Sequence, residues 1–192
     1  VDPGSLFDDF ADYDNNVWHH LPDGLRYSNS TLVAEGHPAI MRSLETFVLS
    51  SITGHFVKSG ICSDALVAIS IHDNLNWSYS GEAGSVKFAW YCDVKFIYGQ
   101  NTTVSDSCGA DPTSLDFTID VTASKVDFTD SACGTLSLND DIASSFVYTY
   151  VGGSCQEVGC TGGWTSFSVN SGAPDPTPAP TAKGSDDEDD DD

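Results

Sequence analysis

The sequence predicts an all-β fold, a two-sheet antiparallel jelly-roll sandwich stapled by disulfides. Apolar and polar residues alternate in several segments, most clearly in Leu115–Thr122, as expected of half-buried strands. No segment of ordinary helix length carries apolar residues at the i, i+3, i+4 and i+7 spacing. Roughly nine to twelve short strands divided by turn residues are typical of a sandwich or barrel. The 192 residues suit one such domain.

The N-terminal third begins with a mixture of Asp, Asn and aromatic residues. Leu6, Phe7 and Phe10 are expected to dock on the core as a first edge strand. Two short strands should follow, and then a strong strand with three β-branched residues on one face. Gly54 and the pair Ser59-Gly60 are expected to break the chain between them. The three strands predicted here are Thr31–Ala34, Ala39–Leu49 and Ala65–His72.

The segment Gly84–Tyr98 is expected to form a long strand, a kink at Cys92-Asp93 and a second short strand. Val86, Phe88 and Trp90 share one face of it. A Trp among inward positions supplies a large apolar area, so this strand should lie in the middle of a sheet. The polar segment that follows, Gly99–Thr113, is expected to be a loop.

The second half should contain a hairpin and three more strands. Ala123-Ser124 joins Leu115–Thr122 to Lys125–Thr129 in that hairpin. The remaining strands are expected around Leu136 and Leu138, at Phe146–Val151 and at Trp164–Val169. The folded domain is predicted to span residues 1–170. A Pro/Thr-rich linker (171–183) and a poly-acidic tail (184–192) are expected to be disordered after it.

Composition limits the partners. Lys and Arg number 7 against 29 Asp and Glu, a formal net charge of -22. Nucleic acid is excluded because its binding depends on neutralising phosphates with Lys and Arg. An anionic membrane surface is disfavoured for the same reason, and no apolar run is long enough to insert into a bilayer. Glycans, cations, basic proteins and self-association stay open.

Cysteines and sequons predict a secreted protein. An even number of cysteines suggests a disulfide framework and an oxidising compartment. The sequons start at Asn29, Asn76 and Asn101. The chain starts with Val, as in a mature form or a fragment. Proximity favours the pair Cys155–Cys160; the remaining four allow Cys62–Cys92 with Cys108–Cys133, or Cys92–Cys108 with Cys62–Cys133.

An acidic cluster near the N-terminus is the candidate metal site. It consists of Asp8, Asp9, Asp12 and Asp14. Calcium takes six to eight oxygen ligands, so Ca²⁺ is the cation that such a cluster would suit, and no other cofactor is indicated. An EF-hand starting at Asp12 fails because Val17 stands in place of the turn glycine and Asp23 in place of the final Glu. A solvated acidic turn is the simpler interpretation.

Four segments together resemble the concanavalin A-like lectin/glucanase superfamily. They are the opening FDDFADYDNNVWHH, the central VKFAW, the VDFTD strand and the terminal WTSFSV. The resemblance covers residues 6–170 and lies in the order and character of the strands. It implies a jelly roll of two curved antiparallel sheets, which binds or cleaves carbohydrate on its concave sheet.

The motifs of two enzyme classes are missing or incomplete. The paired-acid motif of laminarinase-like glucanases, E-x-D-x-x-E or E-x-D-x-E, is absent, and glycoside hydrolysis generally needs two carboxyls at one bond. Three segments, Arg42–Glu45, Ile71-His72 and Lys95–Gln100, loosely echo the motifs of jelly-roll alginate lyases in order. Since His72 lacks the preceding Gln and the last segment lies mid-chain, the echo is treated as coincidence. No enzymatic activity is therefore expected.

The sequence-based hypothesis is a secreted, non-catalytic carbohydrate-binding module. Sugar recognition needs aromatic faces, and Trp77, Tyr79, Tyr91 and Tyr98 are the candidate platform. A glycan on Asn76 would crowd Trp77. The alternatives are an extracellular structural or filament-forming protein with a cation-binding acidic tail, and a polysaccharide hydrolase or lyase.

Overall fold

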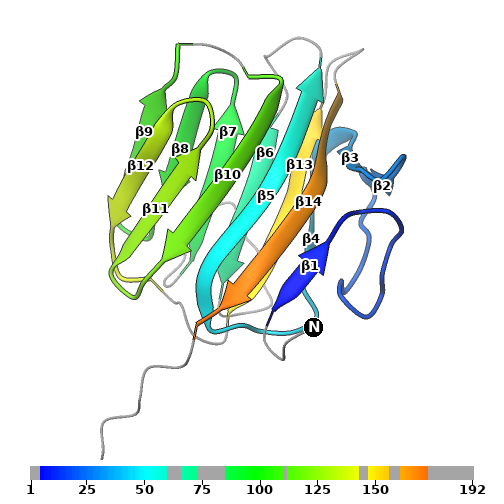
Figure 1. The fold of residues 1–192 in the computed structure, drawn as a ribbon, viewed down its shortest axis with the longest axis horizontal. Coiled ribbons are helices and arrows are strands. Elements are labelled where there is room, and N and C mark those ends of the chain that lie inside the picture. The colour runs from blue at the N-terminus through cyan, green and yellow to red at the C-terminus, as the bar shows by residue number, and fades with distance from the viewer. Residues whose placement is uncertain are drawn as a thin grey trace, which may run out of the picture.

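The computed structural model describes residues 5–59, 66–72, 85–109, 112–142, 147–155 and 161–172. Two antiparallel sheets pack face to face (Figure 1), and the described residues contain no α-helix. The predicted all-β sandwich is therefore confirmed. Among these residues, no helix has the length and apolarity needed to cross a membrane.

The first sheet has eight strands. Seven follow one path across the sheet, and the eighth, the short N-terminal strand, pairs with the C-terminal one through Leu6↔Val169. In path order the strands are β12 (Gly134–Asn139), β11 (Lys125–Asp130), β10 (Ser114–Val121), β5 (Leu49–Ser59), β14 (Thr161–Ser171), β3 (Leu32–Ala34) and β2 (Leu25–Tyr27), with β1 (Leu6–Asp8) beside β14.

The second sheet has six strands. Its centre is formed by the strand pair β6–β7, so the Trp-bearing strand lies mid-sheet as predicted. In order they are β4 (Gly36–Arg42), β13 (Tyr148–Cys155), β6 (Leu66–His72), β7 (Val86–Tyr91), β8 (Val94–Tyr98) and β9 (Thr103–Ser107).

The core lies between the sheets and follows the alternation of the strands. On β7, Val86, Phe88 and Trp90 are each 1% exposed, and the alternate apolar residues of β10 are 0–6% exposed. The Phe88 ring of one sheet packs edge-on against the Phe128 ring of the other, with centroids 5.7 Å apart. Burial of these large side chains at about 25 cal/mol per Å² is the main stabilising contribution to such a sandwich.

Contrary to the prediction, Gly54 does not interrupt the β structure. It lies inside β5, an 11-residue strand that pairs with β10 and β14. A Cβ atom at this position would lie 2.7 Å from Phe117 Cζ and 2.8 Å from the Ser166 carbonyl oxygen. Gly54 is therefore needed because the Phe117 ring occupies the space of its missing side chain.

Two other expectations need correction. The predicted kink at Cys92-Asp93 is a hairpin turn, because β7 and β8 pair antiparallel with Tyr91 opposite Val94. Cys92 adopts the left-handed φ of 57° that tight turns require. The predicted polar loop Gly99–Thr113 contains β9, an edge strand whose polar residues are exposed on both faces. An edge strand buries little, so it lacks an apolar signal in the sequence.

One disulfide joins the sheets. Cys108, just after β9, pairs with Cys133, in the turn between β11 and β12. Cys92 is also disulfide-bonded, so the alternative pair Cys92–Cys108 is excluded. Cys62, Cys160 and the side chain of Cys155 lie outside the described residues, as do residues 173–192 with most of the predicted linker and the acidic tail.

Beside this disulfide lies a buried ion pair. Lys95 of β8 points into the core, where its Nζ lies 2.7 Å from Asp130 Oδ2, and both side chains are fully buried. The ammonium also donates to the carbonyl oxygens of Phe128 (3.3 Å) and Gly134 (2.5 Å). All three ammonium protons are therefore satisfied, which is the condition under which a charge can be buried.

Candidate functional site

The outer face of the six-stranded sheet is the part of the molecule where polar, aromatic and cationic side chains meet. Because Val86, Phe88 and Trp90 of β7 point inward, Lys87, Ala89 and Tyr91 point outward. The same alternation turns the residues next to the core positions of β6, β8 and β13 outward.

The strand register aligns five of these residues in one line, here called the transverse row. Arg42 of β4 is opposite Tyr150, Tyr150 is opposite Ser70, Ser70 is opposite Lys87, and Lys87 is opposite Tyr98. Neighbouring strands are about 4.8 Å apart, so the row extends about 19 Å across the sheet. An extended ligand lying perpendicular to the strands would meet all five side chains.

Two residues flank the transverse row on one side. Tyr148 of β13 is opposite His72 of β6, two residues along from Tyr150 and Ser70. The guanidinium carbon of Arg42 lies 4.4 Å from the centroid of the Tyr148 ring. This cation–π contact orients Arg42 over the face, and its Nη1 donates to the Ser43 carbonyl oxygen at 3.2 Å.

The centre of this face is shielded from solvent. Ser70, His72 and Tyr150 are 1–3% exposed and Lys87 is 9% exposed, and each of them makes at least one interaction. Burial raises the pKa of Tyr150 above its usual value; the charge of Arg42 opposes this shift and the neighbouring Tyr148 adds to it. The Tyr150 phenol therefore stays protonated at neutral pH.

The β8 end of the face is open and aromatic. Tyr91 and Tyr98, two of the four predicted ligand-binding residues, are each 38% exposed. The rings of Phe96 and Tyr98 stack with centroids 5.6 Å apart and an interplanar angle of 15°. Burial raises the pKa of Tyr98. The other two predicted residues, Trp77 and Tyr79, lie outside the described residues.

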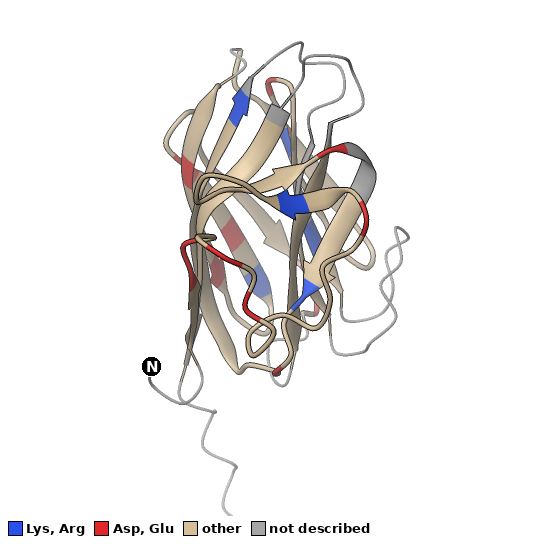
Figure 2. Ribbon diagram, turned by 90° about the vertical axis from the view of Figure 1, so that its right-hand side faces the viewer, with Lys and Arg blue, Asp and Glu red and all other residues tan. Residues whose placement is uncertain are grey.

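Carboxylates are nearly absent from this sheet. Asp106 of the edge strand β9 is the single acidic residue in the six described strands. By contrast, Arg42 and Lys87 are two of only seven Lys and Arg residues in a chain of net charge -22, and Figure 2 shows how sparse the basic positions are along the described ribbon. This face therefore offers cations and phenols instead of paired acids.

The predicted metal-binding acids are not arranged as a metal site. Asp8 is 8% exposed, and its carboxylate accepts hydrogen bonds from Phe10 N (2.6 Å), Trp18 Nε1 (2.5 Å) and Tyr27 OH (3.4 Å). Asp9 and Asp14 accept bonds from backbone N–H groups two residues ahead. Together with Asp12 they line an open hollow of about 470 Å³, but no three acidic, His or Cys groups among the described residues gather closely enough to hold a metal ion.

Sequence reasoning missed most of the transverse row. The alternation in Phe146–Val151 places Tyr148 and Tyr150 on one face, as the structure confirms. The register that brings Arg42, His72 and Lys87 beside them joins strands far apart in the sequence. No local pattern specifies such non-local pairing.

The fold is shared with carbohydrate-active enzymes of known structure. Bacillus licheniformis β-glucanase superposes with a TM-score of 0.63 at 9% identity, over 88% of this chain and 99% of that one. The apo Crh5 transglycosylase gives 0.60 at 12% identity (90% and 86%), and the laminarinase from Flavobacterium sp. UMI-01 gives 0.60 at 13% (85% and 98%). No protein-family model matches the sequence, and no curated protein does.

These comparisons confirm the concanavalin A-like jelly roll. They also correct two expectations, namely a non-catalytic lectin-like module and the absence of enzymatic activity. The solved structures that match include a glucanase, a transglycosylase and a laminarinase, so the alternative of a polysaccharide hydrolase or lyase fits better. Identities of 9–13% establish a shared fold; the chemistry has to be argued from the residues of this chain.

Proposed function

We propose that the chain is a polysaccharide-cleaving enzyme that works by β-elimination on an acidic polysaccharide. The observation that carries this proposal is the transverse row with its flanking His72: two cations, a buried imidazole and a buried phenol on one face, with no pair of carboxylates in the strands that form it. The matching carbohydrate-active enzymes support a carbohydrate substrate on this fold.

Elimination suits these groups better than hydrolysis does. Glycosidases of the two-carboxyl type need an acid and a second carboxylate at one bond. Elimination from a uronic acid residue needs a cation beside the sugar carboxylate, a base that removes the proton on C5 and an acid that protonates O4 as it leaves. The cation stabilises the charge that develops on the carboxylate in the transition state, and the proton transfers are general acid–base steps.

Each requirement has a residue in or beside the transverse row. Lys87, on the strand next to His72, would hold the carboxylate of the cleaved sugar, and Arg42, about 14 Å away along the row, would hold the carboxylate of another sugar of the polymer. The His72 imidazole would take the C5 proton as the C4–O4 bond breaks and a C4=C5 double bond forms. Tyr150 would protonate O4, because its raised pKa keeps the phenol protonated until the leaving oxygen needs the proton. His72 then returns its proton to solvent, and Tyr150 regains one.

The open aromatic end would bind the chain beyond the cleaved bond. Tyr91, Phe96 and Tyr98 present ring faces on which a pyranose can stack, and they begin where the transverse row ends. The row's length of about 19 Å fits an extended oligosaccharide. A substrate that reaches His72 and Lys87 has to displace the contacts that shield them, so binding at the exposed end should come first.

The test is incubation of the full chain with a polyuronate, a sulfated galactan and a neutral β-glucan. New reducing ends and the ultraviolet absorbance of a conjugated double bond are followed together. The proposal expects both signals from the polyuronate alone. Tyr150→Phe and His72→Ala should each lower the rate by at least ~10²-fold, whereas the exposed control His20→Ala should not change it.

Hydrolysis is the competing outcome of the same assay. Reducing ends from the neutral β-glucan without any double bond would contradict elimination and would place the catalytic acids outside the six described strands. No cleavage of any of the three polymers would contradict polysaccharide cleavage by either route.

Secretion is part of the proposal, supported by the Cys108–Cys133 disulfide and the exposed sequon residues Asn29 and Asn101.

A further inference from the structure

The opposite surface of the molecule carries a second, unrelated group of side chains. On the outer face of the eight-stranded sheet, His55 of β5 lies between two residues of β10. Its Nδ1 is 2.6 Å from Asp116 Oδ1, and its Nε2 is 3.2 Å from Ser114 Oγ. Both imidazole nitrogens are therefore engaged, one by a carboxylate and the other by a hydroxyl.

The backbone explains why these side chains meet. Lys58 N donates to Thr113 O (2.9 Å), so those two residues form a hydrogen-bonded pair of the antiparallel ladder. The next pair, Val57↔Ser114, and the pair His55↔Asp116 are then non-hydrogen-bonded pairs, whose side chains approach each other most closely. Asp116 is held further by Ser131, whose Oγ accepts from Asp116 N at 3.1 Å.

We propose that Ser114, His55 and Asp116 form a nucleophilic triad that hydrolyses short carboxylic esters. A carboxylate on Nδ1 fixes the tautomer that leaves Nε2 free to accept the serine proton, and this arrangement is recognised by geometry whatever the fold. The Ser114 side chain is exposed to solvent, so an ester can reach its oxygen.

The reaction would run in two balanced halves. Ser114 Oγ attacks the ester carbonyl carbon while its proton passes to His55 Nε2; the C–O bond breaks, and the alcohol leaves with that proton. Water then attacks the acyl carbon and gives one proton to His55; the bond from that carbon to Ser114 Oγ breaks, His55 returns the proton to Oγ, and the carboxylic acid leaves. The Ser114 N–H points away from β5, and β11 pairs with β10 only from Phe117 onward, so among the described strands it has no ladder partner and can donate to the oxyanion.

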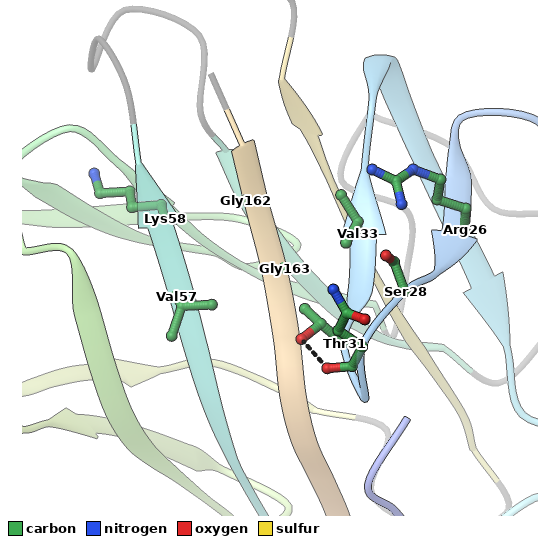
Figure 3. Close-up of a pocket in the computed structure, with 9 residues that line it drawn as sticks. Arg26, Ser28, Thr31, Val33, Val57, Lys58, Gly162 and Gly163 are labelled. Atoms are coloured by element: carbon green, nitrogen blue, oxygen red, sulfur yellow. Dashed lines mark hydrogen bonds between the residues drawn. The ribbon is translucent and has the colours of Figure 1, made fainter. Parts of the chain in front are cut away.

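A pocket of about 310 Å³ is lined on one side by Val57, the neighbour of Ser114 on the next strand, and would hold the alcohol part of the ester (Figure 3). Its floor is the bare backbone at Gly163, with Val33 and Val57 on the strands to either side. Val57 is directly opposite Ser114. The rim carries Arg26, Ser28, Asn29 and Thr31. A small apolar floor under a hydroxyl- and amide-rich rim favours an acetylated polyol over a long-chain lipid ester.

The test uses the full chain without N-glycans, because Asn29 lines the pocket and starts a sequon. p-Nitrophenyl acetate hydrolysis is measured together with labelling by a fluorophosphonate, and the labelled residue is located by peptide mass. Labelling of Ser114 is expected, with a rate that falls at least ~10²-fold in Ser114→Ala and in His55→Ala. Thermal unfolding of each variant checks that it folds.

The matched control is Ser137→Ala. Ser137 lies on the same sheet but donates directly to a carboxylate, Asp127 Oδ1 at 2.5 Å, and no imidazole bonds either residue in the described structure. Its replacement should leave rate and labelling unchanged. The proposal is overturned if the fluorophosphonate labels no serine, if it labels Ser137 as readily as Ser114, or if Ser114→Ala hydrolyses the ester as fast as the parent chain. These outcomes do not depend on polysaccharide cleavage, which uses the other sheet.

Discussion

Lys95 is a charged residue in an apolar core, and all the hydrogen bonds of its ammonium group are made there. Its ammonium is enclosed between the two sheets by Asp130 and two carbonyl oxygens. Replacing one partner of a buried ion pair leaves the other charge uncompensated, and that is much costlier than the net stability of the intact pair.

Lys95→Met should therefore lower the free energy of unfolding by about 3–5 kcal/mol. Urea denaturation measures this change. The exposed pair Lys125–Asp127, 2.7 Å apart, supplies the control, since Lys125→Met should change stability by no more than about 1 kcal/mol. Equal effects of the two substitutions would show that Lys95 and Asp130 are not buried together.

Asp8 adds a pH-dependent contribution to stability. Burial raises its pKa above the ordinary 3.8, although Trp18, Phe10 and Tyr27 donate hydrogen bonds that oppose the shift. A carboxyl with a raised pKa binds its proton more tightly in the native state. Its favourable contribution is therefore present below the unfolded pKa and is lost as the pH rises through the folded pKa.

The stability of the parent chain relative to Asp8→Asn should fall as the pH rises from below 3.8 through the folded pKa of Asp8, and should then level off. Urea denaturation of both proteins at a series of pH values gives this difference in the free energy of unfolding. The contributions of the other carboxyl groups cancel, because both proteins contain them. A difference that grows with pH would mean that the hydrogen bonds outweigh burial at Asp8.

At the scale of single elements, β5 is the strand that organises the eight-stranded sheet. The sequence analysis did not predict it as a continuous strand. It pairs along most of its length with both β10 and β14. Gly54 was interpreted as a break because glycine weakens an isolated strand. Its real role depends on Phe117 and Ser166, which approach from two other strands, so no local reading of β5 could reveal it.

Gly54→Ala should destabilise the fold by about 1–3 kcal/mol, because the added methyl overpacks the Phe117 ring and the Ser166 carbonyl. The midpoint of urea denaturation reports the change. Gly172→Ala is the control: there the nearest atom to a new Cβ is Ser50 Cβ at 3.3 Å, and a change within about 0.5 kcal/mol is expected. An equally stable Gly54→Ala protein would contradict the packing described for β5.

Strands with one solvent-exposed face could be predicted from the sequence. The set of residues that meet at the candidate site could not. The alternation of β10 and β7 identified their buried residues correctly, since burial of one face repeats every second residue. Tyr91 and Tyr98 were predicted as ligand-binding residues because aromatic rings stack on sugars, and both are exposed. His72, Lys87 and Tyr150 lie together only because β13, β6 and β7 pair with one another. This pairing could not be predicted from the sequence.

At the scale of the whole molecule, the two sheets present different chemistries. The outer face of the six-stranded sheet carries cations, phenols and an imidazole, and Asp106 is the single acidic residue of its described strands. The outer face of the eight-stranded sheet carries the Ser114–His55–Asp116 group beside a polar pocket. In a chain of net charge -22, a locally basic face would attract an anionic polymer at short range, within the screening length of the solvent.

The most direct test of the central claim is hydrogen–deuterium exchange of the full chain with and without a short oligouronate. Binding across the transverse row should slow exchange in the strands that carry it, namely Gly36–Arg42, Tyr148–Cys155, Leu66–His72 and Val86–Tyr98. Exchange in β5, β10 and β14 should be unchanged. Protection confined to those three strands, or no protection anywhere at saturating oligouronate, would contradict the assignment of the outer face of the six-stranded sheet as the site of polysaccharide binding.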